Sequence, residues 1–319
     1  MKTSADSIAP WTACWQLESA AGCAKRPELD LLIEPVWHEF VDTLTEGARI
    51  LDMATGNGTV ALSCAERARG RGIHVHIDAV DAARINPPRQ VPDPDGHLPQ
   101  LRFQGGIWLE DMPFEDDNFD GVISQFGFEY ADEEQAVSEV SRVLSPGGRL
   151  RLVIHALGGS VWKDIDVRHK RLSGVLAENG VVALVLALVR AQKRQDVTTF
   201  KSKLKHLADA SKNAQKLADQ PVPDDSALFF SSEFLFVWSN RKQYRLDDLL
   251  GSLEDGWANA SGTAMRYAQM LRVARSEEDI LSLCDRLKAA GLTISAVSQV
   301  CSPDNGAQIA WQVDASKPT

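Results

Sequence analysis

A carboxylate and a glycine-rich turn stand where a ligand could be bound. A short apolar run at 48–51 suits a buried strand and ends at Asp52, after which Gly56 and Gly58 follow. Glycine has no Cβ, so the backbone of such a turn can approach a ligand closely. The Ala-rich segment 60–69 comes next and is typical of a helix, whose N-terminus offers free N–H groups to polar ligand atoms. Strand, turn and helix together predict a nucleotide-type binding loop.

The order of the residues in this loop decides between two kinds of ligand. Gly56, Gly58 and Ala61 also satisfy the G-x-G-x-x-A form of the dinucleotide fingerprint. A carboxylate at Asp52 is badly placed beside a pyrophosphate, but it suits an amino group or a bound water of a cationic ligand. S-adenosylmethionine carries a sulfonium and an ammonium and no phosphate, so the loop favours this ligand. A second acid, Asp81, lies where a ribose-binding carboxylate follows such a loop.

The same stretch resembles motif I of the class I methyltransferases, D/E-x-G-x-G-x-G, with Ala54 in place of the first glycine. Two later segments are similar to that superfamily: 112–120, which leads into the fourth strand, and the turn R-V-L-S-P-G-G at 142–148. The resemblance implies an S-adenosylmethionine cofactor. The residues expected to bind it are Asp52, Ala54, Thr55, Gly56, Asn57, Gly58, Asp81, Ala82, Ile107, Trp108, Gln125 and Phe126.

Trp108 departs from the pattern of the family. It stands where many relatives carry the acid that bonds the adenine amino group. An indole can stack on adenine but cannot accept that hydrogen bond, because its nitrogen is only a donor. A backbone carbonyl or Glu110 would have to accept the bond instead.

Three side chains are candidates for proton transfer during catalysis. Histidine side chains titrate near neutral pH, so His155, at the end of the fifth predicted strand, is a candidate base. Glu129 and Tyr130 follow the fourth strand and are alternatives. A base is needed only when the acceptor has a proton to lose. His74 and His76 share one strand face without a third ligand close in sequence, so we expect no metal site.

The elements that must position these residues follow the order of an α/β sheet. Strands are predicted at 48–51, 73–80, 101–104, 121–124, 149–155, 292–300 and 307–313, and helices of the core at 60–69, 131–144 and 277–290. Five prolines between 87 and 99 exclude the usual second crossover helix. The last two strands, joined by a turn-rich connection, are expected to be antiparallel. The resemblance implies a Rossmann-like, doubly wound, seven-stranded sheet with an antiparallel last strand.

These elements divide the chain into three parts. Residues 1–47 predict two helices before the loop. The S-adenosylmethionine-binding core is expected at 48–155 and 276–319. Residues 156–275 do not fit this core and predict a mainly helical insertion after the fifth strand, which forms the substrate or lid region.

Two segments outside the core have two interpretations each. Trp11 and Trp15 either pack against the domain or close over the cofactor mouth, as helices before motif I do in similar proteins. The apolar residues 181–189 predict either a helix buried on all sides or a wall for an apolar acceptor. Residues 161–220 carry twelve Lys and Arg against six Asp and Glu. This excess is usually a solvated helix face, but it permits an anionic acceptor, an acidic membrane surface or RNA.

The totals limit the class of protein. The 319 residues include 34 Lys and Arg against 44 Asp and Glu, a net charge of −10 that weighs against whole-surface attraction to nucleic acid. Five scattered cysteines without a C-x-x-C pair argue against a disulfide scaffold and structural zinc. We see no secretory signal and no apolar run that approaches the ~20 residues of a spanning helix. A cytoplasmic protein without a transmembrane segment is expected.

These features predict a methyltransferase that moves a methyl group from S-adenosylmethionine to an O or N atom of a small-molecule acceptor, and they leave room for a homodimer. Two alternatives stay open. One is methylation of a lipid-like quinone or isoprenoid at a membrane surface. The other is a non-catalytic S-adenosylmethionine-binding regulatory protein, which Trp108 and the long insertion would fit. A dehydrogenase is the weakest alternative, because it has no reason to carry the turn at 142–148.

Overall fold

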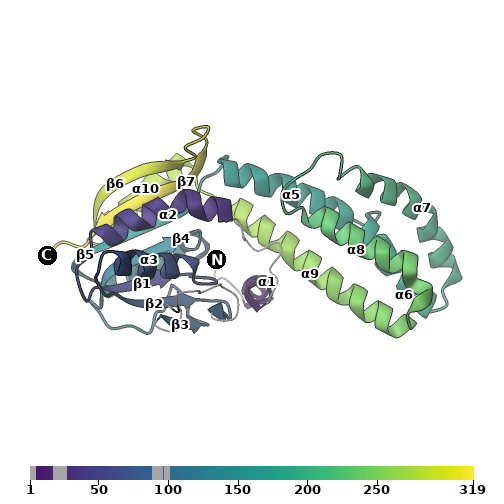
Figure 1. Ribbon diagram of the computed structural model, residues 1–319, viewed down its shortest axis with the longest axis horizontal. Helices are drawn as coiled ribbons and strands as arrows, with labels where there is room; N and C mark the ends of the chain where they lie inside the picture. Colours follow the sequence, from purple (N-terminus) through teal and green to yellow (C-terminus); the bar gives the residue numbers. More distant parts are fainter. Residues whose placement is uncertain (1–4, 17–26, 88–95, 97–100) are drawn as a thin grey trace. The chain divides into compact units, whose positions relative to one another are not determined.

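The computed structural model describes residues 5–16, 27–87, 96 and 101–319. Within these residues the chain divides into two compact units, each with its own core. The first contains the helix α1 (Ala5–Gln16) and residues 27–163 and 270–319, and the second contains 164–269. The chain enters the second unit through α5 (Ser160–Leu176) and leaves it through α9 (Leu246–Val273) (Figure 1).

A seven-stranded sheet forms the centre of the first unit and confirms the predicted fold class. Its strands are β1 (Arg49–Met53), β2 (His76–Asp81), β3 (Arg102–Gly105), β4 (Phe119–Gln125), β5 (Leu144–His155), β6 (Thr293–Cys301) and β7 (Gln308–Ser316). Their order in space is β3-β2-β1-β4-β5-β7-β6. The pairs among β1 to β5 are parallel, and β7 is antiparallel to both of its neighbours. The sheet therefore reverses direction only at β7.

One face of the sheet packs on the helices α4 (Glu133–Val143) and α10 (Glu277–Ala289). Alternate residues of β5, namely Leu150, Leu152 and Ile154, join this core, because side chains of a strand point to opposite faces in turn. Both helices begin at a side-chain cap. Asp132 accepts a hydrogen bond from Gln135 N–H, and Ser276 forms a capping box with Asp279.

On the other face, α2 (Pro27–Asp42) and α3 (Thr59–Gly70) lie side by side (Figure 1). The α2 side chains Ile33, Trp37 and Phe40 are buried there. A Cβ on Gly121 of β4 would come within 2.9 Å of the Phe40 ring, so glycine lets α2 approach this strand closely. Residues 82–86, after β2 and before the prolines, contain no helix, and residues 88–95 and 97–100 lie outside the described residues.

The second unit is helical, and its apolar helix is buried. In α6 (Val181–Lys193), all residues from Val181 to Val189 except Ala183 and Ala187 are buried, and the helix packs against α7 (Val197–Gln215) and α8 (Ser226–Asn240). The interpretation of 181–189 as a buried helix is thereby confirmed. Six of the twelve basic residues in 161–220 form ion pairs with carboxylates of the unit: Arg168, Lys170, Arg171, Arg190, Lys193 and Lys203. These pairs reduce the charge that remains for an anionic partner.

Two further expectations concern the environment of the protein. Within the described residues, one helical stretch, Ser160–Lys193, is long and apolar enough to cross a membrane, and half of its most apolar window is buried in the structure. A buried core helix meets the same criterion. Cys64, Cys284 and Cys301 are free, whereas Cys14 is disulfide-bonded. Disulfides are rare in the cytosol, so this bond weighs against the expected compartment, which stays a prediction.

Candidate functional site

The turn after β1 has an unusual backbone. Ala54, Gly56 and Gly58 all have a positive φ, of 53°, 57° and 82°. Glycine adopts this left-handed region without cost, whereas a residue with a Cβ is strained there by about 1–2 kcal/mol. Ala54 thus occupies, under strain, the position where the family motif has its first glycine. The turn keeps the shape of the motif despite the substitution.

Asp81 at the end of β2 holds the turn in place. Its Oδ2 accepts a hydrogen bond of 2.8 Å from Gly56 N–H, and its Oδ1 accepts one of 2.7 Å from Ala83 N–H. Asp52 at the end of β1 accepts a hydrogen bond of 2.6 Å from the Thr55 hydroxyl. Both carboxylates are buried, and neither forms an ion pair with a described residue. Two acids are therefore brought together without a cationic partner in the part of the chain that the structure describes.

Burial changes the acidity of this pair. Removal from water raises the pKa of Asp52 to about 7, and the nearby charge of Asp81 adds to the shift. Burial also raises the pKa of Asp81 to about 6. A ligand with positive charge and hydrogen-bond donors would relieve this penalty. The residues present therefore fit S-adenosylmethionine, whose ammonium and ribose hydroxyls are such groups.

Helix α1 covers the turn. A Cβ on Gly56 would lie 2.8 Å from the Trp15 ring, so the indole rests on the glycine. Trp11 is stacked on Trp15, with ring centroids 6.1 Å apart, and meets the Tyr130 ring edge-on at 5.6 Å. The two tryptophans were expected either to pack against the domain or to close over the cofactor mouth. Because they pack on the domain at the turn itself, the two interpretations are compatible.

A second cluster lies at the ends of β4 and β5. Glu129 Oε1 accepts a hydrogen bond of 2.9 Å from His155 N–H and lies 2.6 Å from His155 Nδ1. The Phe126 ring packs on the imidazole with its centroid at 4.2 Å. Tyr130 is next to Glu129 in sequence and meets His155 edge-on at 6.4 Å. The three predicted catalytic candidates are thus neighbours in space.

The remaining predicted cofactor residues occupy different surroundings. Gln125 Oε1 accepts a hydrogen bond of 2.6 Å from Trp37 Nε1–H, which ties the end of β4 to α2. Ile107 N–H donates to the Asp81 carbonyl at 3.0 Å, and the half-buried Trp108 follows it. Glu110 accepts a hydrogen bond from Asp132 N–H at 2.8 Å. This carboxylate supports the start of α4, which weakens the suggestion that it accepts the adenine bond.

Two others lie along the loops. Ala82, which follows Asp81, is half-buried, and so is Asn57, whose Oδ1 accepts a hydrogen bond of 2.8 Å from the Thr59 hydroxyl. His74 is exposed and pairs with Glu46. The described residues contain no group of three or more His, Cys, Asp or Glu that could hold a metal ion.

The sequence interpretation missed two residues that connect the clusters. The Ser124 hydroxyl donates to the Met53 carbonyl at 2.9 Å and accepts from Phe128 N–H at 3.1 Å. Gly127 packs against the strained turn, because a Cβ there would lie 2.3 Å from the Ala54 Cβ. The sequence signal for this contact was Gly127 itself, a glycine just after the end of a strand, together with Ala54 in a position where the family motif has glycine.

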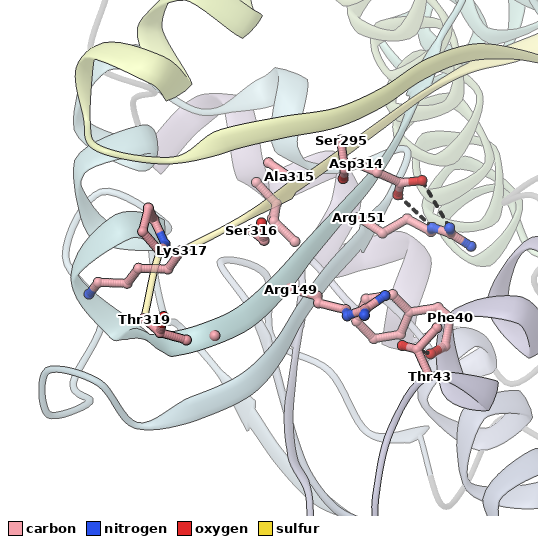
Figure 2. A pocket seen from close by; sticks show the side chains of 13 residues that line it. Phe40, Thr43, Arg149, Arg151, Ser295, Asp314, Ala315, Ser316, Lys317 and Thr319 are labelled. Carbon is pink, nitrogen blue, oxygen red and sulfur yellow. Dashed lines mark hydrogen bonds and ion pairs between the residues drawn. The ribbon is translucent and has the colours of Figure 1, made fainter.

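A cavity of about 410 Å³ lies away from both clusters, near the start of β5. Figure 2 shows Arg151 and Asp314 joined by two hydrogen bonds, of 2.6 and 2.9 Å, with Arg149 and Phe40 close by. Arg151 Nη1 also donates to the Val36 carbonyl, so its charge is used to join α2 to the sheet. None of the predicted site residues lines this cavity.

Comparison with known proteins gives a match to one family model, described as a methyltransferase domain, over residues 51–152. A demethylmenaquinone methyltransferase of Thermus thermophilus is 42% identical over 118 residues, which are 34% of this chain and 49% of that protein. A ubiquinone/menaquinone biosynthesis C-methyltransferase UbiE of Geotalea daltonii is 36% identical over 124 residues, 37% of this chain and 51% of that protein. The chain therefore spans about half the length of the curated relatives it matches.

Among solved structures, a SAM dependent methyltransferase from Aquifex aeolicus aligns with 94% of this chain and 97% of its own. The TM-score is 0.45 and the identity 14%.

The first prediction concerns the pH dependence of stability. Both carboxyl groups have a pKa above the ordinary value of 3.8, so the folded protein retains protons that the unfolded chain has lost. The stability they contribute is present below pH ~4 and is lost as the pH rises through about 6 and 7. Asp52→Asn should flatten this decline and raise the free energy of unfolding at pH ~8 by about 2–4 kcal/mol.

Urea unfolding of the ligand-free protein between pH ~4.5 and ~8 measures this effect. The control is Asp304→Asn, in the exposed turn between β6 and β7, which should follow the wild type. An unchanged decline in the Asp52 variant would mean that burial does not penalise this carboxylate.

The second prediction concerns the contact between Gly127 and Ala54. Gly127→Ala forces two Cβ atoms together and should destabilise the protein by about 1–3 kcal/mol. Ala54→Gly removes one of these atoms and the left-handed strain. The double variant should therefore recover at least ~1 kcal/mol relative to the sum of the single effects. Additive effects in a double-mutant cycle of unfolding free energies would contradict the contact.

Proposed function

We propose that this chain, whose residues 51–152 match a methyltransferase domain, transfers a methyl group from S-adenosylmethionine to an O or N atom of a small-molecule acceptor. The observation that supports this proposal most is the pair of buried carboxylates, Asp52 and Asp81, on either side of a glycine turn and without a cationic partner among the described residues. The ends of β4 and β5 add groups that can handle a proton.

The residues of the turn have distinct roles in this proposal. Asp52 attracts the cationic amino-acid part of the cofactor, and Asp81 accepts hydrogen bonds from its ribose hydroxyls while it holds Gly56. Gly56 and Gly58 keep the surface of the turn free of side chains. When bound, S-adenosylmethionine supplies a methyl carbon activated by the positive sulfur. Trp15 rests on Gly56, so it must move or stack on the ligand when the turn is occupied.

The chemical step requires alignment more than covalent help from the protein. A lone pair of the acceptor atom forms a bond to the methyl carbon while the carbon–sulfur bond breaks, and the electron pair of that bond stays on sulfur. Holding the reacting atoms in line can contribute roughly 7–11 kcal/mol to lowering the barrier. In this proposal the acceptor is held by residues at the ends of β4, which neighbours β1, and of β5, which neighbours β4.

A second candidate function is methylation of a ring carbon of a quinone-type acceptor. It is favoured by the names of the two relatives, a demethylmenaquinone methyltransferase and a ubiquinone/menaquinone biosynthesis C-methyltransferase, and by the aromatic rings of Trp11, Phe126 and Tyr130 near the end of β5. The match to the family model ends at residue 152, before the helical second unit, and the matches to these relatives cover about a third of the chain. Their substrate is therefore a suggestion for this chain and not a consequence of the match.

The third prediction tests the cofactor site. Titration calorimetry should detect S-adenosylmethionine binding, and Asp52→Asn should weaken it about 100-fold, because the cation loses its buried partner. Since Asp52 must be ionised to bind a cation and burial raises its pKa to about 7, wild-type affinity should rise between pH ~6 and ~8. The Asp52 variant should lose most of this rise.

The matched control is again Asp304→Asn, which should bind as the wild type does. Methyl-labelled cofactor with a host metabolite extract then identifies which molecule gains the label and at which atom. Binding without label transfer to any molecule would favour the non-catalytic alternative. Failure of the wild type to bind the cofactor at all would refute the proposal.

A further inference from the structure

The geometry of Glu129 and His155 assigns the two side chains different roles. Both are buried, and Glu129 Oε1 lies 2.6 Å from His155 Nδ1. A carboxylate in this position holds a hydrogen on Nδ1, which leaves the lone pair of the neutral ring on Nε2. Nε2 has no hydrogen-bond partner in the described part of the chain. The free nitrogen of the pair is therefore the one that can accept a proton.

The imidazole cannot easily turn away from this orientation. Glu129 Oε1 also accepts the backbone N–H of His155 at 2.9 Å, so the carboxylate is fixed to the strand that carries the ring. Phe126 covers one face of the imidazole, with ring centroids 4.2 Å apart. Phe126 itself has a φ of 54°, and its N–H donates to the Val153 carbonyl at 2.8 Å. A strained residue of this kind is typical of a functional site.

Two neighbouring polar atoms are buried without a partner. They are Glu129 Oε2 and Tyr130 Oη, which make no hydrogen bond with any described residue. Each buried unsatisfied polar group costs about 1–3 kcal/mol, and such groups are rare in folded proteins. Their occurrence on adjacent residues beside an available imidazole nitrogen points to a ligand that completes the hydrogen bonds. The surrounding rings of Trp11, Phe126 and Tyr130 favour a flat, aromatic ligand.

We propose that Glu129, Tyr130 and His155 form the acceptor site, which binds an aromatic compound with a hydroxyl group and a second polar group beside it. This inference rests on the proposed function and specifies its acceptor. His155 Nε2 is the catalytic base, and Glu129 is a positioning residue for the imidazole. Glu129 Oε2 and Tyr130 Oη bind the second polar group, as acceptor and donor. In this proposal the three residues are no longer alternative bases, because each has its own role in a single site.

His155 takes up the proton that the acceptor loses. The O–H bond of the acceptor breaks, its proton goes to His155 Nε2, and its electron pair stays on the oxygen. That oxygen then forms the new bond to the methyl carbon. The imidazolium next to Glu129 is stabilised by the carboxylate until its proton passes to water. The same deprotonation would make a ring carbon beside the hydroxyl nucleophilic. After methyl transfer to that carbon, its C–H bond breaks, the electron pair returns to the ring, and the proton leaves to His155 Nε2 once this nitrogen has passed its first proton to water.

The fourth prediction uses 1,2-dihydroxybenzene as the probe, with methyl-labelled S-adenosylmethionine. Label transfer should fall at least ~100-fold in His155→Asn and in Glu129→Gln, while calorimetric cofactor affinity stays within about twofold of wild type. Tyr130→Phe should raise KM about tenfold with little change in kcat, because it removes one hydrogen bond to bound acceptor. The control is Glu134→Gln on the exposed side of α4, which should behave as wild type.

A nuclear magnetic resonance measurement on [15N]histidine-labelled protein tests the arrangement even when the probe is not methylated. His155 should carry its hydrogen on Nδ1, and the probe should shift the Nε2 resonance. Glu129→Gln should change both which ring nitrogen carries the hydrogen and how the two nitrogen resonances depend on pH. A hydrogen on Nε2, or no shift with the probe at millimolar concentration, would overturn the inference. Wild-type transfer rates in the Glu129 and His155 variants would do the same. Failure of the wild-type protein to bind S-adenosylmethionine would instead contradict the proposed function.

Discussion

The hydrogen bond from Gly56 N–H to Asp81 is the interaction on which the rest of the site depends. It joins the turn after β1 to the end of β2, and it is possible because these strands are parallel neighbours whose carboxyl ends meet at one edge of the sheet. With the turn fixed there, Ala54 remains in a left-handed conformation and Asp52 is buried beside Thr55. A second bond, from Thr55 N–H to the Val80 carbonyl at 2.9 Å, joins the same turn to β2.

The same arrangement of strands explains why the cofactor and acceptor clusters are adjacent. β4 lies between β1 and β5, so residues at its end can contact both. Ser124 bonds to the Met53 carbonyl on one side, while Phe126, with its positive φ, bonds to Val153 and covers His155 on the other. In open α/β sheets ligands bind outside the carboxyl ends of the strands. Here the short connection after β4 links the two halves of that edge.

Sequence reasoning predicted the parts of the molecule that depend on local chemistry. The turn with Gly56 and Gly58, the buried helix at 181–189 and the reversed last strand were all expected, because glycines, apolar runs and turn residues act over a few positions. Contacts between distant residues were not predictable in the same way. Glu129 and His155 are 26 residues apart and meet only through the register of β4 with β5. The sequence indicated each of them as a candidate for proton transfer, but it could not predict the hydrogen bond between them.

The two clusters also show why an acceptor is harder to predict than a cofactor. Buried carboxylates such as Asp52 and Asp81 select for charge, and few cofactors combine positive charge with hydroxyl donors, so two residues narrow the choice greatly. The unpaired atoms Glu129 Oε2 and Tyr130 Oη require only hydrogen-bond partners, which many molecules could supply. Shape must provide the remaining selection, and here it comes from aromatic rings contributed by α1 and by the connection after β4. Since those rings are brought together by folding, acceptor choice follows from tertiary structure more than from any motif.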